Sequence, residues 1–289
     1  VPSRLSIVNA LRGHPEAAAT LMRLFAVRFD PENGLDMKAR AAEAERVTAE
    51  FTRLMESVDS LADDRALRRM LLLIEATVRT NFYRHGGTSP TAVSGGVPYI
   101  SFKFALQQLQ SITKSKLLYE VWTHSSRMAG VHHRGALVSR GGIRHSDRPD
   151  DFRTEVFGLV RTQNVKNAVI VPAGSKGGFI TRRKMTDPVE AGEEAKEQYK
   201  TLIRGLLDIT DNLVDGEVQP APGVVAYDGP DPYLVVAADK GTAKFSDIAN
   251  GVAAEYDFWL GDAFASGGSN GYDHKAVGIT ARGAWECVK

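Results

Sequence analysis

Two lysines and a run of glycines flank one apolar segment in the middle of the chain. Lys166 precedes residues 168–171, and Lys176 follows them within the glycine-rich run 174–178. Glycine has no Cβ atom, so a ligand can approach the backbone of such a run closely. A lone lysine is usually a solvated surface charge, but two lysines around one buried segment favour a site that binds an anion.

A helix is expected to lead into this segment. Asp150 and Asp151 occupy positions suited to N-caps. Apolar residues then recur with helical spacing, at Phe152, Val156, Leu159 and Val160. The same stripe continues to Gln163, whose amide would cost roughly 1–3 kcal/mol if it were buried without partners. We therefore expect Gln163 to orient a polar group.

Residues 168–171 are all apolar and mostly β-branched, which predicts a strand covered on both faces. Pro172 cannot continue a hydrogen-bond ladder, so the strand is expected to end there. In open α/β sheets, ligands bind beyond the carboxyl ends of the parallel strands. The sequence therefore predicts that Lys176 lies in a glycine loop where a substrate would bind.

A strand–helix–strand unit is expected to follow. A helix over residues 188–208 opens with an Asp-Pro pair, and residues 233–238 form a second apolar strand. Asp239 is the first charged residue after that strand, so we expect its carboxylate to meet Lys176 at one edge of a parallel sheet. Alternatively, Asp239 could cap the helix that is expected to begin near Ser246.

The rest of the chain divides near residue 95. Three amphipathic helices are expected before it, over residues 14–28, 40–58 and 61–83. Glycine- and proline-rich turns between residues 86 and 98 mark the boundary. Beyond it we expect strands over residues 99–104, 117–123 and 136–138, and a closing helix over residues 247–259.

Composition limits the classes of function. The chain has 289 residues, 43% hydrophobic and 25% charged, which is typical of a soluble globular protein. A formal net charge of +1 gives no basic field for nucleic acid, and no apolar run suits a membrane span or a signal peptide. The single cysteine, Cys287, excludes an internal disulfide and fits a reducing compartment. Val1 at the start, and a helix still in progress over residues 279–289, indicate a piece of a longer protein.

The sequence lacks the motifs that several classes of reaction require. Ser175 and Gly177 flank Lys176 where a Walker A loop has glycine and then Ser or Thr, and no G-x-G-x-x-G motif is present. His132 and His133 are adjacent and cannot converge on a metal as an i, i+4 pair does, so we expect no metal site. No serine lies in a nucleophile elbow, which leaves acyl transfer unsupported.

Longer motifs occur between residues 130 and 289, among them GGIR, QNVKNAVIVP, GSKGGF, FSDIANG and GITARGAWE, while RTNFYR and SFKF occur within residues 67–104. Through these motifs the chain resembles the catalytic region of the large NAD-dependent glutamate dehydrogenases of bacteria, in the amino-acid dehydrogenase superfamily. The resemblance implies an α/β fold with a mixed, partly parallel sheet and flanking helices, preceded by a helical region. The implied parts are a helical region over residues 1–95, a substrate domain over residues 96–265, and a segment over residues 266–289 that connects to a nucleotide-binding domain beyond this chain.

The resemblance also implies roles for single residues. Lys176 matches the catalytic lysine that activates water or ammonia and stabilises the carbinolamine, and Asp239 matches the acid/base carboxylate. Gln163 and Lys166 match the pair that binds the substrate α-carboxylate. Thr280 matches the threonine that meets the nicotinamide amide of NAD, the implied cofactor, whose main binding domain is expected outside this chain.

An arginine and two glycines match the site for the side-chain carboxylate of the substrate. Gly141 and Gly142 match the turn beneath that carboxylate, and Arg140 stands where the small-subunit enzymes have a lysine. A guanidinium can bind a carboxylate through two hydrogen bonds, so Arg140 could keep the role. Arg144 is a competing candidate.

The implied function is NAD-dependent oxidative deamination of L-glutamate to 2-oxoglutarate and ammonia, by a cytoplasmic homo-oligomer that binds neither nucleic acid nor membrane. Physical reasoning agrees, because a substrate with two carboxylates needs clustered cations in a chain of low net charge. Two alternatives stay open: a dicarboxylate-binding regulatory module without catalysis, and a dehydrogenase of another amino acid. The first 95 residues alone would also fit a helical scaffold for assembly.

Overall fold

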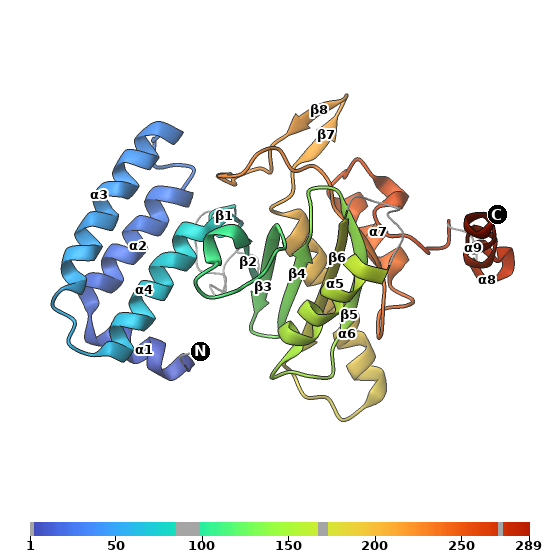
Figure 1. The fold of residues 1–289 in the computed structure, drawn as a ribbon, viewed down its shortest axis with the longest axis horizontal. Helices are drawn as coiled ribbons and strands as arrows, with labels where there is room; N and C mark the ends of the chain where they lie inside the picture. The colour runs from blue at the N-terminus through green and yellow to red at the C-terminus, as the bar shows by residue number, and fades with distance from the viewer. Residues whose placement is uncertain (1–2, 85–98, 167–172, 271–273) are drawn as a thin grey trace.

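The computed structural model describes residues 3–84, 99–166, 173–270 and 274–289. Helices α1–α4 form one end of the molecule, a sheet with helices on both faces forms the middle, and α8 and α9 lie at the opposite end (Figure 1). No helix within the described ranges is both long and apolar enough to cross a membrane.

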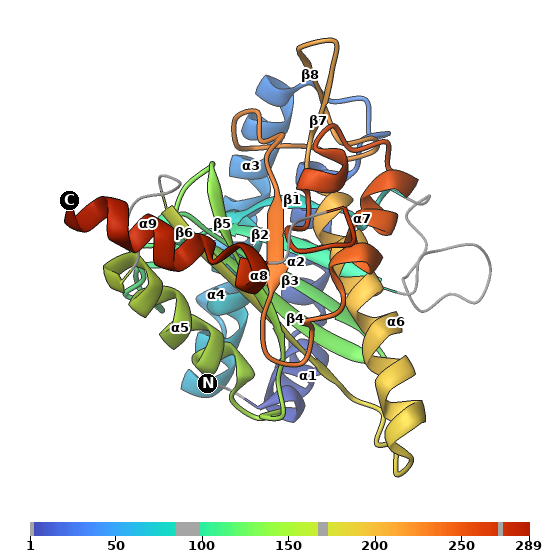
Figure 2. The ribbon, with the colours of Figure 1, turned by 90° about the vertical axis from the view of Figure 1, so that its right-hand side faces the viewer.

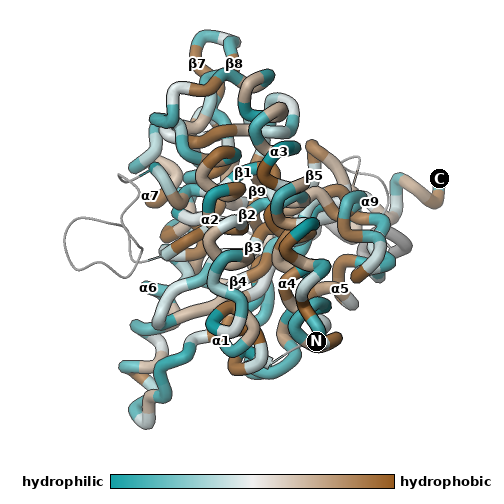
Figure 3. The backbone as a smooth tube through the Cα atoms, turned by 90° about the vertical axis from the view of Figure 1, so that its left-hand side faces the viewer, coloured by the Kyte–Doolittle hydropathy of each residue, from teal (hydrophilic) through white to brown (hydrophobic). Residues whose placement is uncertain are grey.

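The helical end consists of α1 (Arg4–Gly13), α2 (Pro15–Phe29), α3 (Met37–Met55) and α4 (Leu61–Ala76). Hydrophobic and hydrophilic residues alternate along these helices (Figure 3), as expected for helices with one buried face. Ser3, Asp36 and Ser60 cap three of them by accepting hydrogen bonds from first-turn N–H groups. The apolar faces meet in a cluster around Leu21 and Phe51, which holds these helices together.

The predicted helices over residues 14–28 and 40–58 are confirmed by α2 and α3. The third, over residues 61–83, is wrong beyond Ala76, because strand β1 (Thr77–Thr80) follows directly. This strand is rich in β-branched residues and pairs with the next strand. Strand pairing therefore outweighs the helical periodicity that continues through the segment.

Within the described residues, seven strands form one sheet in the order β1-β2-β3-β4-β6-β5-β9. The strands after β1 are β2 (Tyr99–Ala105), β3 (Tyr119–Ser125), β4 (Met128–Arg134), β5 (Ser139–His145), β6 (Ala173–Thr181) and β9 (Val235–Ala238). Pairing is antiparallel from β1 to β6, whereas β5 runs parallel to both β6 and β9. The predicted mixed, partly parallel sheet is confirmed.

Three helices cover the two faces of this sheet: α5 (Phe152–Lys166), α6 (Pro188–Leu207) and α7 (Ser246–Glu255). Adjacent residues of β6 define the faces. A Cβ atom on Gly178 would lie 2.4 Å from Val156 of α5. The next residue, Phe179, lies with its ring 6.1 Å from that of Tyr199 of α6. Figure 2 shows α5 and α6 on opposite sides of the sheet, with α7 packed against α6.

Predictions for the second part of the chain succeed for most elements. The strands expected over residues 99–104, 117–123 and 233–238 are confirmed by β2, β3 and β9. The helices over residues 188–208 and 247–259 are confirmed by α6 and α7, although α7 ends at Glu255. The strand expected over residues 136–138 is wrong, since these residues bend between β4 and β5. The strand expected over residues 168–171 lies outside the described residues.

The glycine loop predicted over residues 174–178 is also wrong, because β6 (Ala173–Thr181) includes all of it. The glycines here serve close packing instead of a turn. A Cβ atom on Gly177 would lie 3.0 Å from both His132 and Ile143, so the strand and its neighbours leave little room for a side chain.

A buried ionic cluster ties the sheet to the segment between α6 and β9. Its cations are Arg79, Lys103 and Arg134, and its carboxylates are Asp211, Asp228 and Asp231. Arg79 Nη1 lies 2.7 Å from Asp211 Oδ1, and Lys103 Nζ lies 2.6 Å from Asp231 Oδ2. Equal numbers of opposite charges make this burial tolerable.

The remaining short elements lie at the edges. They are the 3₁₀ turns Leu106–Leu109 and Gly261–Ala263, the hairpin of β7 (Asn212–Val214) and β8 (Glu217–Gln219), and helices α8 (His274–Val277) and α9 (Ile279–Val288). The predicted division into residues 1–95, 96–265 and 266–289 stays a prediction.

Candidate functional site

Lys176 lies in the middle of β6, between β4 and β5. Residues two apart share a face of a strand, so Lys176 is on the same face as Gly178, which α5 covers. The side chain is 6% exposed as a residue, and its Nζ atom forms an ion pair with Oδ2 of Asp239, directly after β9. The structure thus brings together the two residues predicted to be catalytic, although Lys176 reaches Asp239 from within a strand.

Strand β5 separates these two residues, and Gly142 is the position where the pair can cross it. The register of β5 on β6 places Gly142 beside Lys176. A Cβ atom on Gly142 would lie 2.8 Å from the carbonyl oxygen of Ala238 and 3.0 Å from Cβ of Asp239. Glycine therefore keeps open the space next to the ion pair.

The turn predicted at Gly141 and Gly142 is wrong, because both residues lie inside β5. A Cβ atom on Gly141 would lie 1.5 Å from the carbonyl oxygen of Ser175, so any larger residue would push β5 away from β6. Packing between strands explains both glycines. Their role beneath a substrate carboxylate stays a prediction.

Arg144 lies between two carboxylates on the α5 face. Its Nη1 atom is 2.7 Å from Oε1 of Glu155, in the first turn of α5. Its Nε and Nη2 atoms are each 3.4 Å from an oxygen of Asp239. The second oxygen of Glu155 accepts a hydrogen bond of 2.6 Å from the hydroxyl of Ser146. The guanidinium thus makes its shorter contact with Glu155.

The electrostatics keep both carboxylates ionised at neutral pH. Burial favours the neutral form of Asp239, but hydrogen bonds from Lys176, from Arg144 and from the next backbone N–H hold its pKa below the usual value. Burial likewise favours neutral Glu155, but hydrogen bonds from Ser146 and Arg144 lower its pKa. Two cations and two anions therefore face one another in this part of the site.

Arg140 has a different environment from Arg144. It is exposed at the start of β5, and its Nη2 atom donates a 2.6 Å hydrogen bond to Ser266 Oγ. Four residues of strand separate the two arginines, about 13 Å. Arg140 contacts a neutral hydroxyl, whereas Arg144 is paired with carboxylates, so Arg140 has more capacity to bind a further anion.

Three predicted site residues cannot be placed at the level of side chains. Gln163 and Lys166 belong to the last turn of α5, and Thr280 to the first turn of α9. Their side chains lie outside the part of the chain that the structure describes, so their roles stay predictions.

His133 and Glu120 extend the site and were not predicted. His133 of β4 pairs across the strands with Lys176, and Glu120 of β3 pairs with His133. Cross-strand partners share a face with Cβ atoms about 4.5–5.5 Å apart. His133 Nδ1 is 3.3 Å from Glu120 Oε2, and Arg153 of α5 donates to both oxygens of Glu120. A row of polar side chains therefore leads from β3 to Lys176.

Sequence reasoning missed Glu155 for a physical reason. A carboxylate in the first turn of a helix is usually explained by the helix dipole, and nothing local shows that it faces an arginine on a strand. Thr242 was missed as well. Its hydroxyl donates to the carbonyl of Ile143 at 2.5 Å and accepts from the N–H of Asp239 at 3.2 Å. It thereby fixes the loop that carries Asp239 against β5.

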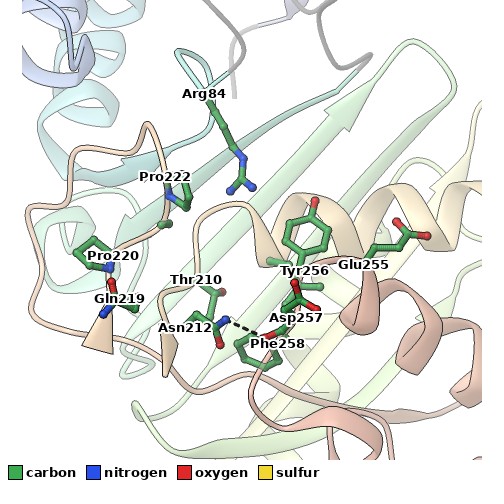
Figure 4. Close-up of a pocket in the computed structure, with 12 residues that line it drawn as sticks. Arg84, Thr210, Asn212, Gln219, Pro220, Pro222, Glu255, Tyr256, Asp257 and Phe258 are labelled. Atoms are coloured by element: carbon green, nitrogen blue, oxygen red, sulfur yellow. Dashed lines mark hydrogen bonds between the residues drawn. The ribbon is translucent and has the colours of Figure 1, made fainter. Parts of the chain in front are cut away.

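A cavity of about 410 Å³ opens between the end of α6, the β7–β8 hairpin and the residues after α7 (Figure 4). Arg84, Tyr256 and Phe258 are among the side chains that line it. No described residue of the Lys176 site is among them. Leu207 on its wall belongs to α6, on the face of the sheet opposite α5. The cavity and the charged site are therefore separate.

Comparisons with known proteins agree on one family. Residues 50–289 match the family described as bacterial NAD-glutamate dehydrogenase, catalytic domain. The NAD-specific glutamate dehydrogenase of Pseudomonas aeruginosa is 52% identical over 287 residues, and that of Halomonas elongata is 51% identical over 288 residues. Each alignment covers 98% of this chain and 17% of the relative. The chain therefore spans about a sixth of the length of these relatives.

A more distant relative and a solved structure carry similar names. The NAD-specific glutamate dehydrogenase of Mycobacterium tuberculosis is 46% identical over 301 residues, which cover 99% of this chain and 18% of that protein. A crystal structure of hetero-hexameric glutamate dehydrogenase from Thermus thermophilus in a Leu-bound form is 18% identical, with a TM-score of 0.36 over 59% of this chain and 36% of that chain. This structural similarity is too low to support a comparison of the two folds.

Proposed function

Because this chain belongs to the catalytic-domain family of the bacterial NAD-glutamate dehydrogenases, we propose that it forms the substrate side of an active site for the oxidative deamination of L-glutamate to 2-oxoglutarate and ammonia. The activity belongs to the whole protein, of which relatives indicate that this chain is about 17%. The observation that supports the proposal best is the ion pair between the buried Lys176 and the partly buried Asp239.

This pair suits the proton transfers that follow oxidation of the amine to an imine. Water adds to the imine carbon, and the proton that it loses needs a base. Asp239 is ionised at neutral pH and can accept that proton, while the Lys176 ammonium stabilises negative charge on the added oxygen. Asp239 then returns this proton to the nitrogen, which gives the carbinolamine. Asp239 next transfers the second proton from the hydroxyl to the nitrogen as the carbon–nitrogen bond breaks, so the carbonyl forms and ammonia leaves.

We assign the side-chain carboxylate of glutamate to Arg140. Arg144 already has two carboxylate partners, whereas Arg140 has a hydroxyl partner and is exposed. Arg140 lies two residues, about 7 Å, along β5 from Gly142, which is beside Lys176. We assign the α-carboxylate to Gln163 and Lys166 of α5, as the resemblance implies.

NAD accepts the hydride in this reaction, but the described residues do not fit the whole cofactor. A dinucleotide fold needs a glycine-rich turn between a parallel strand and a helix. The connections after β5, β6 and β9 span residues 146–151, 182–187 and 239–245, and contain a single glycine, Gly241. We therefore assign NAD to another part of the whole protein and propose only Thr280 as a contact with its nicotinamide end. A cytoplasmic location and a homo-oligomeric state stay predictions.

Steady-state kinetics of the whole protein test this proposal. We expect turnover of L-glutamate with NAD, and much lower kcat/KM with NADP or with L-leucine and L-norvaline. The reverse reaction should need 2-oxoglutarate and ammonia together. Tight binding of 2-oxoglutarate without turnover would instead identify a regulatory module, and preference for L-leucine would identify a dehydrogenase of another amino acid.

A further inference from the structure

The Arg144 guanidinium lies at unequal distances from its two carboxylate partners. It lies 2.7 Å from Glu155 and 3.4 Å from Asp239. Glu155 is fixed at both oxygens, because Arg144 holds one and the hydroxyl of Ser146 holds the other. Arg144 lies in β5, Ser146 directly follows β5 and Glu155 lies in the first turn of α5, whereas Asp239 follows β9. Arg144 is thus held on the side away from Asp239 by a carboxylate that is itself fixed at both oxygens.

The unequal distances have a chemical consequence for Asp239. This carboxylate already carries one close cation, Lys176. If the two 3.4 Å hydrogen bonds from Arg144 to Asp239 shortened, this second cation would stabilise the ionised form further. A carboxylate so stabilised exchanges protons poorly. Glu155 prevents this by competing for the same guanidinium.

We propose that Glu155 is a positioning residue, which holds Arg144 back from Asp239 and so keeps Asp239 able to exchange protons with the substrate. This inference rests on the proposed function, in which Asp239 is the acid/base group. Glu155 does not touch Asp239 and acts through Arg144.

The other charged groups near Asp239 leave this balance in place. From β6, Lys176 is paired directly with Asp239. The Lys240 ammonium is turned away, 2.8 Å from the carboxylate of Asp147. His145 is on the other face of β5, stacked on Phe179. Among the described side chains packed here, Glu155 is therefore the anion that competes with Asp239 for Arg144.

The test compares pH profiles of kcat/KM for L-glutamate in the whole protein. Glu155→Gln keeps the shape of the side chain but removes its charge, so Arg144 should close onto Asp239 and move the acidic limb to lower pH by about one unit. Arg144→Gln should move the same limb to higher pH. A structural role for either residue predicts no such opposite displacements. KM should change less than about threefold in Glu155→Gln, because this residue does not contact substrate.

Two further variants make the outcome decisive. Ser146→Ala frees one oxygen of Glu155 and should shift the limb in the same direction as Glu155→Gln, but less, so the inference can be tested even if Glu155→Gln does not fold. Glu190→Gln is the matched control, since Glu190 is an exposed first-turn carboxylate of α6, and it should leave the profile unchanged.

The possible failures are distinct. If Glu155→Gln and Arg144→Gln shift the limb in the same direction, or not at all, while the unmodified enzyme is active, this inference is overturned and the proposed function stands. A selective rise of KM for glutamate in Arg144→Gln without a shift would return Arg144 to substrate binding. If the acidic limb persists in Asp239→Asn, the proposed role of Asp239 fails, and the inference fails with it.

Discussion

The ion pair between Lys176 and Asp239 forms across β5. The absence of a side chain at Gly142 is therefore as important as the two charges. Lys176 could be recognised from its glycine neighbours, and Asp239 from its place after an apolar strand. The contribution of Gly142 could not be recognised, because it depends on the register of three strands. Single site residues can therefore be predicted from sequence more easily than the packing that leaves room for their contact.

Replacement of Gly142 by alanine tests this point. The added Cβ atom would lie 2.8 Å from a backbone oxygen of β9, so we expect the loop with Asp239 to shift, with a loss of about 1–3 kcal/mol in stability and at least a tenfold loss in kcat. Gly192→Ala is the control, because Gly192 lies inside α6 with nothing within 4 Å. It should raise stability by about 0.5–1 kcal/mol and leave kcat unchanged. Equal behaviour of the two variants would contradict the account.

Arg140→Ala tests the assignment of the substrate side chain. Only a substrate with a side-chain carboxylate loses a charge-assisted hydrogen bond, of about 1.5–3 kcal/mol. We therefore expect kcat/KM for L-glutamate to fall by roughly 10- to 100-fold, with little change for L-norvaline. Arg148→Ala, at an exposed ion pair with Asp151, is the control. Equal losses for both substrates would mean that Arg140 is structural.

At the scale of elements, sequence patterns succeed where one signal dominates and fail where tertiary contacts decide. Helix α6 has an Asp-Pro start and a long apolar stripe, and β9 is a short apolar run, so both were predicted. The glycines of β6 predict a loop when the sequence is considered alone, because the residues that they pack against lie in α5 and β4. The segment of β1 has the spacing of a helix, because the apolar periodicity of α4 continues across the boundary at Ala76. Each failure concerns a segment whose partners are distant in sequence.

The ionic cluster is the contact between elements that is most sensitive to mutation. Lys103→Met would leave Asp228 and Asp231 buried with fewer cations, so we expect a loss of about 3–5 kcal/mol in the free energy of unfolding. Arg204→Met is the control, because its pair with Glu255 is partly exposed and should contribute under about 1 kcal/mol. Denaturant unfolding measures both. A loss below about 1 kcal/mol for Lys103→Met would show that the cluster does not hold the sheet together.

For the molecule as a whole, two buried histidines predict how stability depends on pH. Burial and charged neighbours lower the pKa of His132 to about 3. Burial and Arg153 outweigh Glu120 and lower the pKa of His133 to about 4. In the unfolded chain both have a pKa near 6.5. Below that pH the unfolded state binds protons that the folded state does not, so stability is full above about pH 6.5 and falls towards pH 4.

Denaturant unfolding of the 289-residue chain at several pH values checks this dependence. At pH 5 each histidine should lower stability by about 2 kcal/mol relative to pH 8. His133→Leu should remove its share of the slope. The carboxylates whose pKa is lowered in the folded state change stability mainly below about pH 4, which is outside this range of pH. Stability that stays constant from pH 8 to pH 5 would show that the two histidines can be protonated in the folded state.

The central claim is that Lys176 performs chemistry in the whole protein and is not a structural charge. Lys176→Met conserves the length of the side chain, and Asp239 keeps Arg144 as a partner, so the variant should fold. The most direct measurement is kcat for L-glutamate with NAD, beside Lys240→Met as a control, since Lys240 is the exposed neighbour of Asp239. We expect Lys176→Met to lose several orders of magnitude in kcat and Lys240→Met to lose almost none. If Lys176→Met keeps more than about a tenth of the activity, a loss under about 1.4 kcal/mol, the claim is wrong.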